Sequence, residues 1–188
     1  MNFSAAPSFN RTLPLFVFLC AVFFAPCSKA LAQETKTHIS SDKIFMITYP
    51  VKWKINRMEQ AELCINGPGS SLFKPSMIKI EITKLAEGYE KHDIKKLSEV
   101  ETKMAKSQNT DKVSFTIEES KFEKIKSVEW WIIKGKITQG KEVFLTDSFK
   151  AIYKGKVYTV TYLATEKKFE ENRAAAKSIF DTFEFLAD

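Results

Sequence analysis

The stretch "IFMITYPVKW", Ile44 to Trp53, decides the fold because it joins a hydrophobic strand to an abrupt end. From Phe45 onward the side chains of both faces are largely apolar, as in a strand that is covered on both sides. Pro50 has no amide hydrogen for a central ladder, so the strand is predicted to end at Tyr49. Trp53 follows three residues later. We predict that its ring folds back and closes one end of the core.

The first 32 residues have the features of a secretory signal peptide. Arg11 supplies a positive charge, Leu13–Pro26 is an apolar run, and Ala30–Ala32 provides small residues for cleavage. The apolar run is shorter than the roughly 20 residues of a membrane-spanning helix. We therefore expect export to the periplasm or the cell exterior, with Gln33 as the first mature residue and no membrane span after cleavage.

The remaining chain divides into a polar, flexible start at 33–42 and one folded domain at 43–188. Its length is that of a single domain with its own core. Cys27, a candidate for lipidation, follows a proline rather than a small residue, which favours cleavage instead. Cys64 is the one cysteine of the mature chain, so no intramolecular disulfide is predicted. We expect a buried small side chain there, and a reactive thiol is the alternative.

The charge of the chain argues against nucleic acid as a partner. The net charge is +6, and removal of the signal peptide lowers it by two units, Arg11 and Lys29. Nearly all of the remaining positive charge is lysine, whereas specific nucleic-acid readers favour the planar arginine fork. A modest lysine excess favours acidic protein surfaces.

Hydrophobic periodicity predicts an α+β fold. Residues 77–85 alternate as in a strand, and 93–106 carry a helical stripe. The stripe consists of Ile94, Leu97, Val100 and Met104. A four-stranded meander follows from Val113, with a two-residue hairpin turn at Lys154–Gly155. Thr165 precedes a last helix, whose predicted buried stripe is Phe169, Ala176, Phe180 and Phe183. Two amphipathic helices and a sheet with apolar residues on both faces indicate a three-layer α/β/α sandwich with a central, mainly antiparallel sheet.

With "FMITYPVKW" at Phe45–Trp53, the meander, and the closing "YTVTYLA" and "IFDTFEF", the chain resembles the PsbP-like family of exported bacterial proteins and photosystem II subunits. The resemblance covers about Lys43 to Phe185 and implies a PsbP/Mog-type α/β/α fold. It implies a binding or assembly role rather than catalysis. The mature histidines, His38 and His92, do not match the metal-binding histidines of some photosynthetic members.

The residues indicate no catalytic, cofactor or metal site. His38 lies in the predicted flexible start, and His92 stands beside Glu90 and Asp93 at a spacing that fits no common metal-ligand pattern. Asp147 lies in the middle of a predicted strand. It is expected either to face solvent or to be a buried acid with a polar partner. We therefore expect a protein that is not an enzyme and carries no cofactor.

Candidate partner-binding residues lie in the long loop Asn66–Ser76 and in the meander. Leu72 and Phe73 are adjacent apolar residues in this polar loop, and they either fold into the core or remain exposed for a partner. The adjacent tryptophans Trp130 and Trp131 must point to opposite faces of a strand, each under a helix or as an exposed anchor. A lysine cluster is also predicted around two hairpins, where it either protects sheet edges or attracts an acidic partner. Its members include Lys134, Lys136, Lys154 and Lys156.

From these features we expect an exported, non-catalytic domain that binds or helps to assemble another envelope protein. The alternative is a carrier of a small ligand or lipid in the cell envelope, with a pocket between the sheet and a helix lined by Phe, Tyr and Trp. The sequence defines neither the partner nor an oligomeric state.

Overall fold

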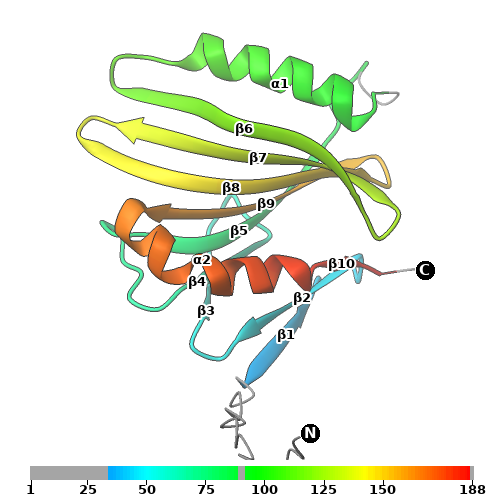
Figure 1. Ribbon diagram of the computed structural model, residues 1–188. Helices are drawn as coiled ribbons and strands as arrows, with labels where there is room; N and C mark the ends of the chain where they lie inside the picture. Colours follow the sequence, from blue (N-terminus) through cyan, green and yellow to red (C-terminus); the bar gives the residue numbers. More distant parts are fainter. Residues whose placement is uncertain (1–33, 89–91, 187–188) are drawn as a thin grey trace, which may run out of the picture. The chain divides into compact units, whose positions relative to one another are not determined.

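A computed structural model of the chain describes residues 34–88 and 92–186 (Figure 1). The predicted signal peptide, its cleavage site and Cys27 lie outside the described residues. The fold is α+β, with mainly antiparallel sheets and two helices, as the hydrophobic periodicity predicts.

The larger sheet has seven strands in the order β3-β4-β5-β9-β8-β7-β6, and every neighbouring pair is antiparallel. Its strands are β3 (Lys54–Asn56), β4 (Leu63–Asn66), β5 (Ser76–Lys84), β6 (Val113–Ile125), β7 (Val128–Gln139), β8 (Glu142–Tyr153) and β9 (Lys156–Thr165). The predicted meander is thus confirmed as β6 to β9. Lys154 and Gly155, both with positive φ, form the two-residue turn between β8 and β9.

A second sheet of three strands, in the order β1-β2-β10, was not predicted. It consists of β1 (Thr35–Ile39), β2 (Phe45–Pro50) and β10 (Glu184–Phe185). The prediction of a flexible start at 33–42 is therefore wrong for the residues of β1. They pair in register with β2, and the hydroxyls of Thr37 and Thr48 lie 2.9 Å apart across the two strands.

Pro50 ends its strand one residue later than predicted. It remains in register with Thr35, and its carbonyl accepts a hydrogen bond of 2.8 Å from the amide of Trp53. A terminal strand residue can be proline because the ladder does not need its amide. The turn that follows brings the indole of Trp53 into the main core, where it is 2% exposed. Trp53 is therefore a core residue, as predicted.

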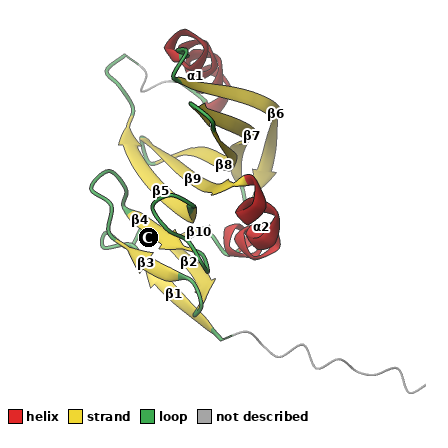
Figure 2. Cartoon of the chain, turned by 90° about the vertical axis from the view of Figure 1, so that its left-hand side faces the viewer, coloured by secondary structure: helices red, strands yellow, loops and turns green. Residues whose placement is uncertain are grey.

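The two helices pack against the large sheet in different places, and Figure 2 shows α1 beside β6 and apart from α2. Their buried residues belong to two different core clusters. Helix α1 (Ile94–Gln108) contacts β6, β7 and β8, and helix α2 (Glu166–Asp181) contacts β2, β5, β8 and β9. The main core joins α2 to both sheets, whereas Ile94 and Leu97 of α1 belong to a smaller cluster around Trp131. Asp93 caps α1, because its Oδ1 accepts a hydrogen bond of 2.8 Å from the amide of Lys96.

Both helical stripes differ in part from their predictions. In α1, Met104 is exposed, while Ser98 is buried. Successive residues of a helix are about 100° apart, so Ala105, eleven residues after Ile94, points within about 20° of the direction of Ile94. Met104, ten residues after Ile94, points about 80° away from it. Ala105 therefore takes the position on the stripe that was predicted for Met104. In α2 the fully buried residue near the end is Ile179, while Phe180 is half-buried.

Candidate functional site

The loop between β4 and β5 presents two apolar side chains to solvent. Leu72 is 90% exposed and Phe73 is 77% exposed. Both occupy the centre of a tight turn, in which the amide of Ser71 donates to the carbonyl of Lys74 at 3.1 Å and the amide of Lys74 donates back at 3.2 Å. The turn holds the two side chains at the tip of the loop, away from the core. Leu72 and Phe73 therefore remain exposed rather than folding into the core.

The base of the loop is fastened by hydrogen bonds to the start of β5. The amide of Ser76 donates to Oγ of Ser70 at 3.1 Å, and the amide of Gly67 donates to the carbonyl of Ser76 at 2.7 Å. A side chain at Gly67 would meet the Ser76 hydroxyl at 2.9 Å and the Trp53 ring at 3.2 Å. The close approach therefore requires glycine at this position.

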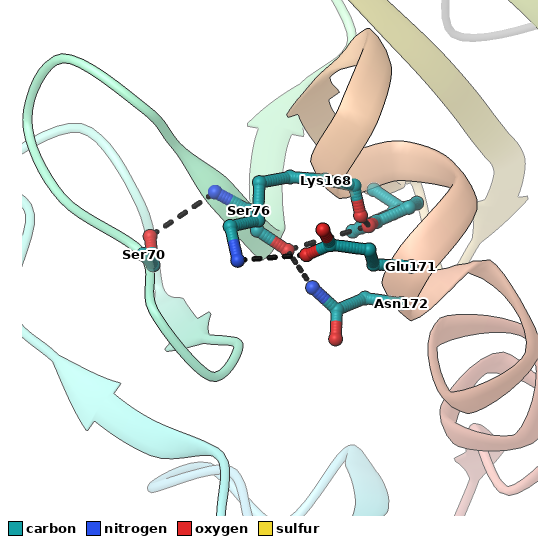
Figure 3. Close-up of polar contacts among 6 residues, drawn as sticks. Ser70, Ser76, Lys168, Glu171 and Asn172 are labelled. Carbon is teal, nitrogen blue, oxygen red and sulfur yellow. Dashed lines mark hydrogen bonds and ion pairs between the residues drawn. The ribbon is translucent and has the colours of Figure 1, made fainter.

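Helix α2 holds the base of the loop from the other side (Figure 3). Nδ2 of Asn172 donates to the buried Oγ of Ser76 at 3.1 Å. The same Oγ lies 3.3 Å from the hydroxyl of Tyr162, which donates to the carbonyl of Lys168 at 3.0 Å. Burial raises the pKa of Tyr162, so its hydroxyl stays protonated as a donor. The network connects the loop, β9 and α2.

The candidate anchors Trp130 and Trp131 are not exposed. They are 6% and 2% exposed, and they pack in different clusters. Trp130 stacks on Phe185 with ring centroids 5.7 Å apart, and Nε1 of Trp131 donates to Oγ of Ser120 at 2.9 Å. The interpretation of either tryptophan as an exposed partner-binding anchor is therefore wrong. The C-terminal segment covers the ring of Trp130, and the cluster that includes α1 surrounds the ring of Trp131.

The candidate lysines do not form one patch. The β7–β8 hairpin and the β8–β9 hairpin lie at opposite ends of β8 (Figure 1), which separates Lys134 and Lys136 of β7 from Lys154 and Lys156. Lys134 forms an ion pair with Glu119. Nζ of Lys156 lies 3.9 Å from a carboxylate oxygen of Asp42, and Nζ of Lys154 lies 5.5 Å from the ring centre of Tyr153. The predicted lysine cluster is therefore wrong as a single docking surface.

The residues that could carry chemistry are placed apart or within the core. Cys64 is buried, and desolvation raises the pKa of its thiol, as expected for a structural cysteine. The side chain of Asp147 is only 19% exposed, with Oδ2 at 3.7 Å from Nε of Arg173. The carboxyl is thus half-buried with Arg173 as a polar partner, which is nearer to the buried acid of the two alternatives. Within 34–88 and 92–186, no group of three or more His, Cys, Asp or Glu residues is arranged to hold a metal ion.

A cavity of about 340 Å³ lies between β8, β9, the β6–β7 hairpin and the end of α2. Its walls are mainly aromatic, and they include Trp130, Phe149, Tyr153, Phe180, Phe183 and Phe185. The volume is within the range of about 300–1,000 Å³ found for small-molecule sites. The sequence predicted a pocket lined by Phe, Tyr and Trp but not which residues line it. The reason is that β10 and the β6–β7 hairpin come from distant parts of the chain.

Comparison with known proteins identifies the fold. Cyanobacterial PsbP (CyanoP) from Synechocystis sp. PCC 6803 superposes with a TM-score of 0.63, at 10% identity over 87% of this chain and 99% of that one. The fold is PsbP-like. LpqN of Mycobacterium tuberculosis, involved in cell envelope biogenesis, gives a TM-score of 0.59 at 12% identity, over 82% of this chain and 91% of that one.

These similarities are structural. No protein-family model matches the sequence, and no curated protein matches it either. Among the described residues, no helix is both long enough and apolar enough to cross a membrane.

Proposed function

We propose that this PsbP-like domain is an exported, non-catalytic binding module that docks on another envelope protein through Leu72 and Phe73. The observation that carries the proposal is the pair of adjacent apolar side chains, 90% and 77% exposed, at the tip of a hydrogen-bonded turn. Single exposed apolar residues are common on protein surfaces, whereas two adjacent ones at the tip of an ordered loop form a small contiguous patch of the kind that favours an interaction site. An exported location, with cleavage after residue 32, belongs to the same proposal.

The bracing of the loop supports a docking role. Ordering a flexible loop costs free energy on binding, and a loop that is already ordered avoids much of that cost. Ser70 and Ser76 fix its base, and Asn172 ties Ser76 to α2. Lys74 stands beside Phe73, and Nζ of Lys168 lies 3.0 Å from the position that a Cβ on Gly69 would take. Lysines next to an apolar tip favour a partner with acidic residues around an apolar pocket.

The test is the double variant Leu72→Ser/Phe73→Ser, with Met104→Ser as the matched control. Met104 is also an exposed apolar side chain, but it lies on α1. A partner is cross-linked from envelope extract, identified by mass spectrometry, purified, and titrated with each protein. We expect the double variant to lose at least about tenfold in affinity, with its Tm unchanged, and the control to bind as the parent does. Equal affinity of the double variant and the parent would refute docking through this loop.

The aromatic cavity favours a second candidate function, a carrier of a small apolar ligand. A lining with six aromatic rings is suited to an apolar or aromatic molecule. Native mass spectrometry of the protein purified from its host distinguishes the two functions, because a carrier retains a bound small molecule. We also propose that the scaffold has three layers, α1, the seven-stranded sheet and α2, with the small sheet beside α2.

A further inference from the structure

The face of the large sheet toward α1 changes character along its length. Near the start of α1, Ile94 and Leu97 pack on an apolar cluster. Farther along, β8 and β9 place hydroxyl side chains on this face, in antiparallel register. Ser148 is opposite Thr161, and Lys150 is opposite Thr159. Helix α1 contacts β6, β7 and β8, and the side chains of Lys150, Thr159 and Thr161 are half-buried, so this polar part of the face is only partly covered and is accessible to a ligand.

A cavity of about 430 Å³ lies over the hydroxyl-bearing part of the sheet. Helix α1 contributes Glu101 and Ala105 to its wall, rather than large apolar side chains that would fill the space. Met58 is both exposed and part of the lining, which places it where the cavity meets solvent. The volume is suitable for a small molecule.

One hydroxyl in this cavity has no partner. Thr146 is 4% exposed, and its Oγ1 is buried without a hydrogen bond to any described residue. The hydroxyls of Ser148 and Thr161 lie 3.0 Å apart and can satisfy each other only in part. A buried polar group without a partner is unfavourable. Rotation of the Thr146 side chain about its Cα–Cβ bond would turn Oγ1 toward the cavity, where a ligand hydroxyl could satisfy it.

The charged residues of the lining are balanced. Nζ of Lys79 lies 3.0 Å from a carboxylate oxygen of Glu81, and Lys150 forms an ion pair with Glu101. An anionic ligand would have to compete with a glutamate for a lysine, and a cationic ligand would have to compete with a lysine for a glutamate. A purely apolar ligand would leave the hydroxyls of Thr146 and its neighbours without partners. The remaining class is a neutral molecule that carries several hydroxyl groups.

We propose that this cavity binds a neutral, polyhydroxylated small molecule of the size of a mono- or disaccharide. Hydroxyls of the ligand would bond to Thr146, Thr159 and the Ser148–Thr161 pair. Its less polar faces would lie against the apolar part of the lining, which includes Met77 and Leu163. The site is separate from the loop tip at Leu72 and from the aromatic cavity, so it stands independently of the proposed docking function.

The test is a titration of the ¹⁵N-labelled domain, followed by NMR, with glucose, maltose and N-acetylglucosamine as probes. Succinate and putrescine serve as anionic and cationic probes. We expect at least one sugar to shift the amides around Thr146 and Thr161 in a saturable way, and neither charged probe to do so. The proposal is overturned if none of the sugars shifts these amides at its solubility limit. It is equally overturned if a charged probe binds there in their place.

Substitution then tests the role of the unpartnered hydroxyl. Thr146→Val keeps the shape of the side chain and removes the hydroxyl, and it should lower the affinity for the bound sugar roughly tenfold. Thr159→Val should also weaken binding, and it provides the test if Thr146→Val does not fold. Thr138→Val in β7, outside the cavity lining, is the control and should bind as the parent does. Unchanged affinity in both cavity variants would contradict the proposal.

Discussion

Nδ2 of Asn172 in α2 donates a hydrogen bond of 3.1 Å to Oγ of Ser76, the first residue of β5, across 96 positions of sequence. Ser76 has no exposed surface, and its own amide bonds to Ser70 of the loop. The helix therefore fixes the base of the loop through one buried hydroxyl. The stability of the core and the shape of the proposed docking tip depend on the same residue.

We predict that Ser76→Ala lowers the free energy of unfolding by about 1–3 kcal/mol, because Asn172 and Tyr162 each lose a buried hydrogen-bond partner. Urea denaturation of the two proteins measures the change. Asn172→Ala, at a half-buried position, should cost less, about 1 kcal/mol. A loss below about 0.5 kcal/mol for Ser76→Ala would show that the network contributes little to stability.

Trp53→Ala should destabilise the domain by roughly 3–5 kcal/mol, the usual range for a buried large-to-small change. The ring is in the main core, with its centre 6.3 Å from that of Tyr162. Trp53→Phe keeps part of the packing and should cost clearly less. Denaturant melts of both variants decide the matter. If Trp53→Ala costs less than about 1 kcal/mol, the indole does not close the core as its burial suggests.

The sequence predicts elements whose signals are local. The alternation over residues 77–85 and the turn at Lys154–Gly155 depend on neighbouring residues, and the structure confirms them as β5 and the β8–β9 turn. The three-stranded sheet depends instead on distant pairing, such as Glu184 with Met46. No local pattern marks a two-residue strand that forms only when the chain end reaches β2.

In the candidate site, too, the sequence predicts the local features, while the features that depend on distant parts of the chain are visible only in the structure. The sequence identifies Leu72 and Phe73 as an unusual pair, but it leaves open whether they are buried, since their exposure depends on the turn that Ser71 and Lys74 close. The alternation of Trp130 and Trp131 is evident from the sequence, but their burial depends on cover from elsewhere in the chain.

Gly135 in β7 leaves room for the ring of Phe115 on the neighbouring strand. A Cβ at this position would lie 2.6 Å from Cε2 of the ring and 3.0 Å from Oγ1 of Thr146. We predict that Gly135→Ala destabilises the domain by about 1–3 kcal/mol, because the ring must move. In a protein that already carries Phe115→Leu, which makes space, Gly135→Ala should cost less free energy of unfolding than it does in the parent. Additive free energies from urea melts would contradict this explanation.

Expression of the full chain with its native N-terminus tests the predicted export. We expect the mature protein to begin at Gln33, after cleavage that follows Ala32. Intact mass spectrometry of the purified protein measures this directly. A mass that includes Met1, or one that corresponds to a lipidated Cys27, would show that the N-terminal segment is not removed as predicted.

Asp147 should make the stability of the domain depend on pH. Burial raises the pKa of this carboxyl above its ordinary value of 3.8, an effect that outweighs the attraction of Arg173, and its Oδ1 is buried without a partner among the described residues. The folded state therefore binds the proton more tightly than the unfolded state. The contribution of this group to stability is thus present below pH 3.8 and is lost as the pH rises through the raised pKa.

Asp147→Asn removes this loss, because the amide stays neutral at every pH. We predict that the variant gains stability over the parent as the pH rises from about 3.8 toward neutrality. The gain should reach on the order of 0.5–1 kcal/mol, since the ion pair with Arg173 is lost at the same time. Arg173→Gln should have the opposite effect at pH 7, because it leaves the buried carboxylate without its cation. Urea melts of the three proteins across this pH range measure both effects, and a parent more stable than Asp147→Asn at pH 7 would show that the ion pair outweighs burial.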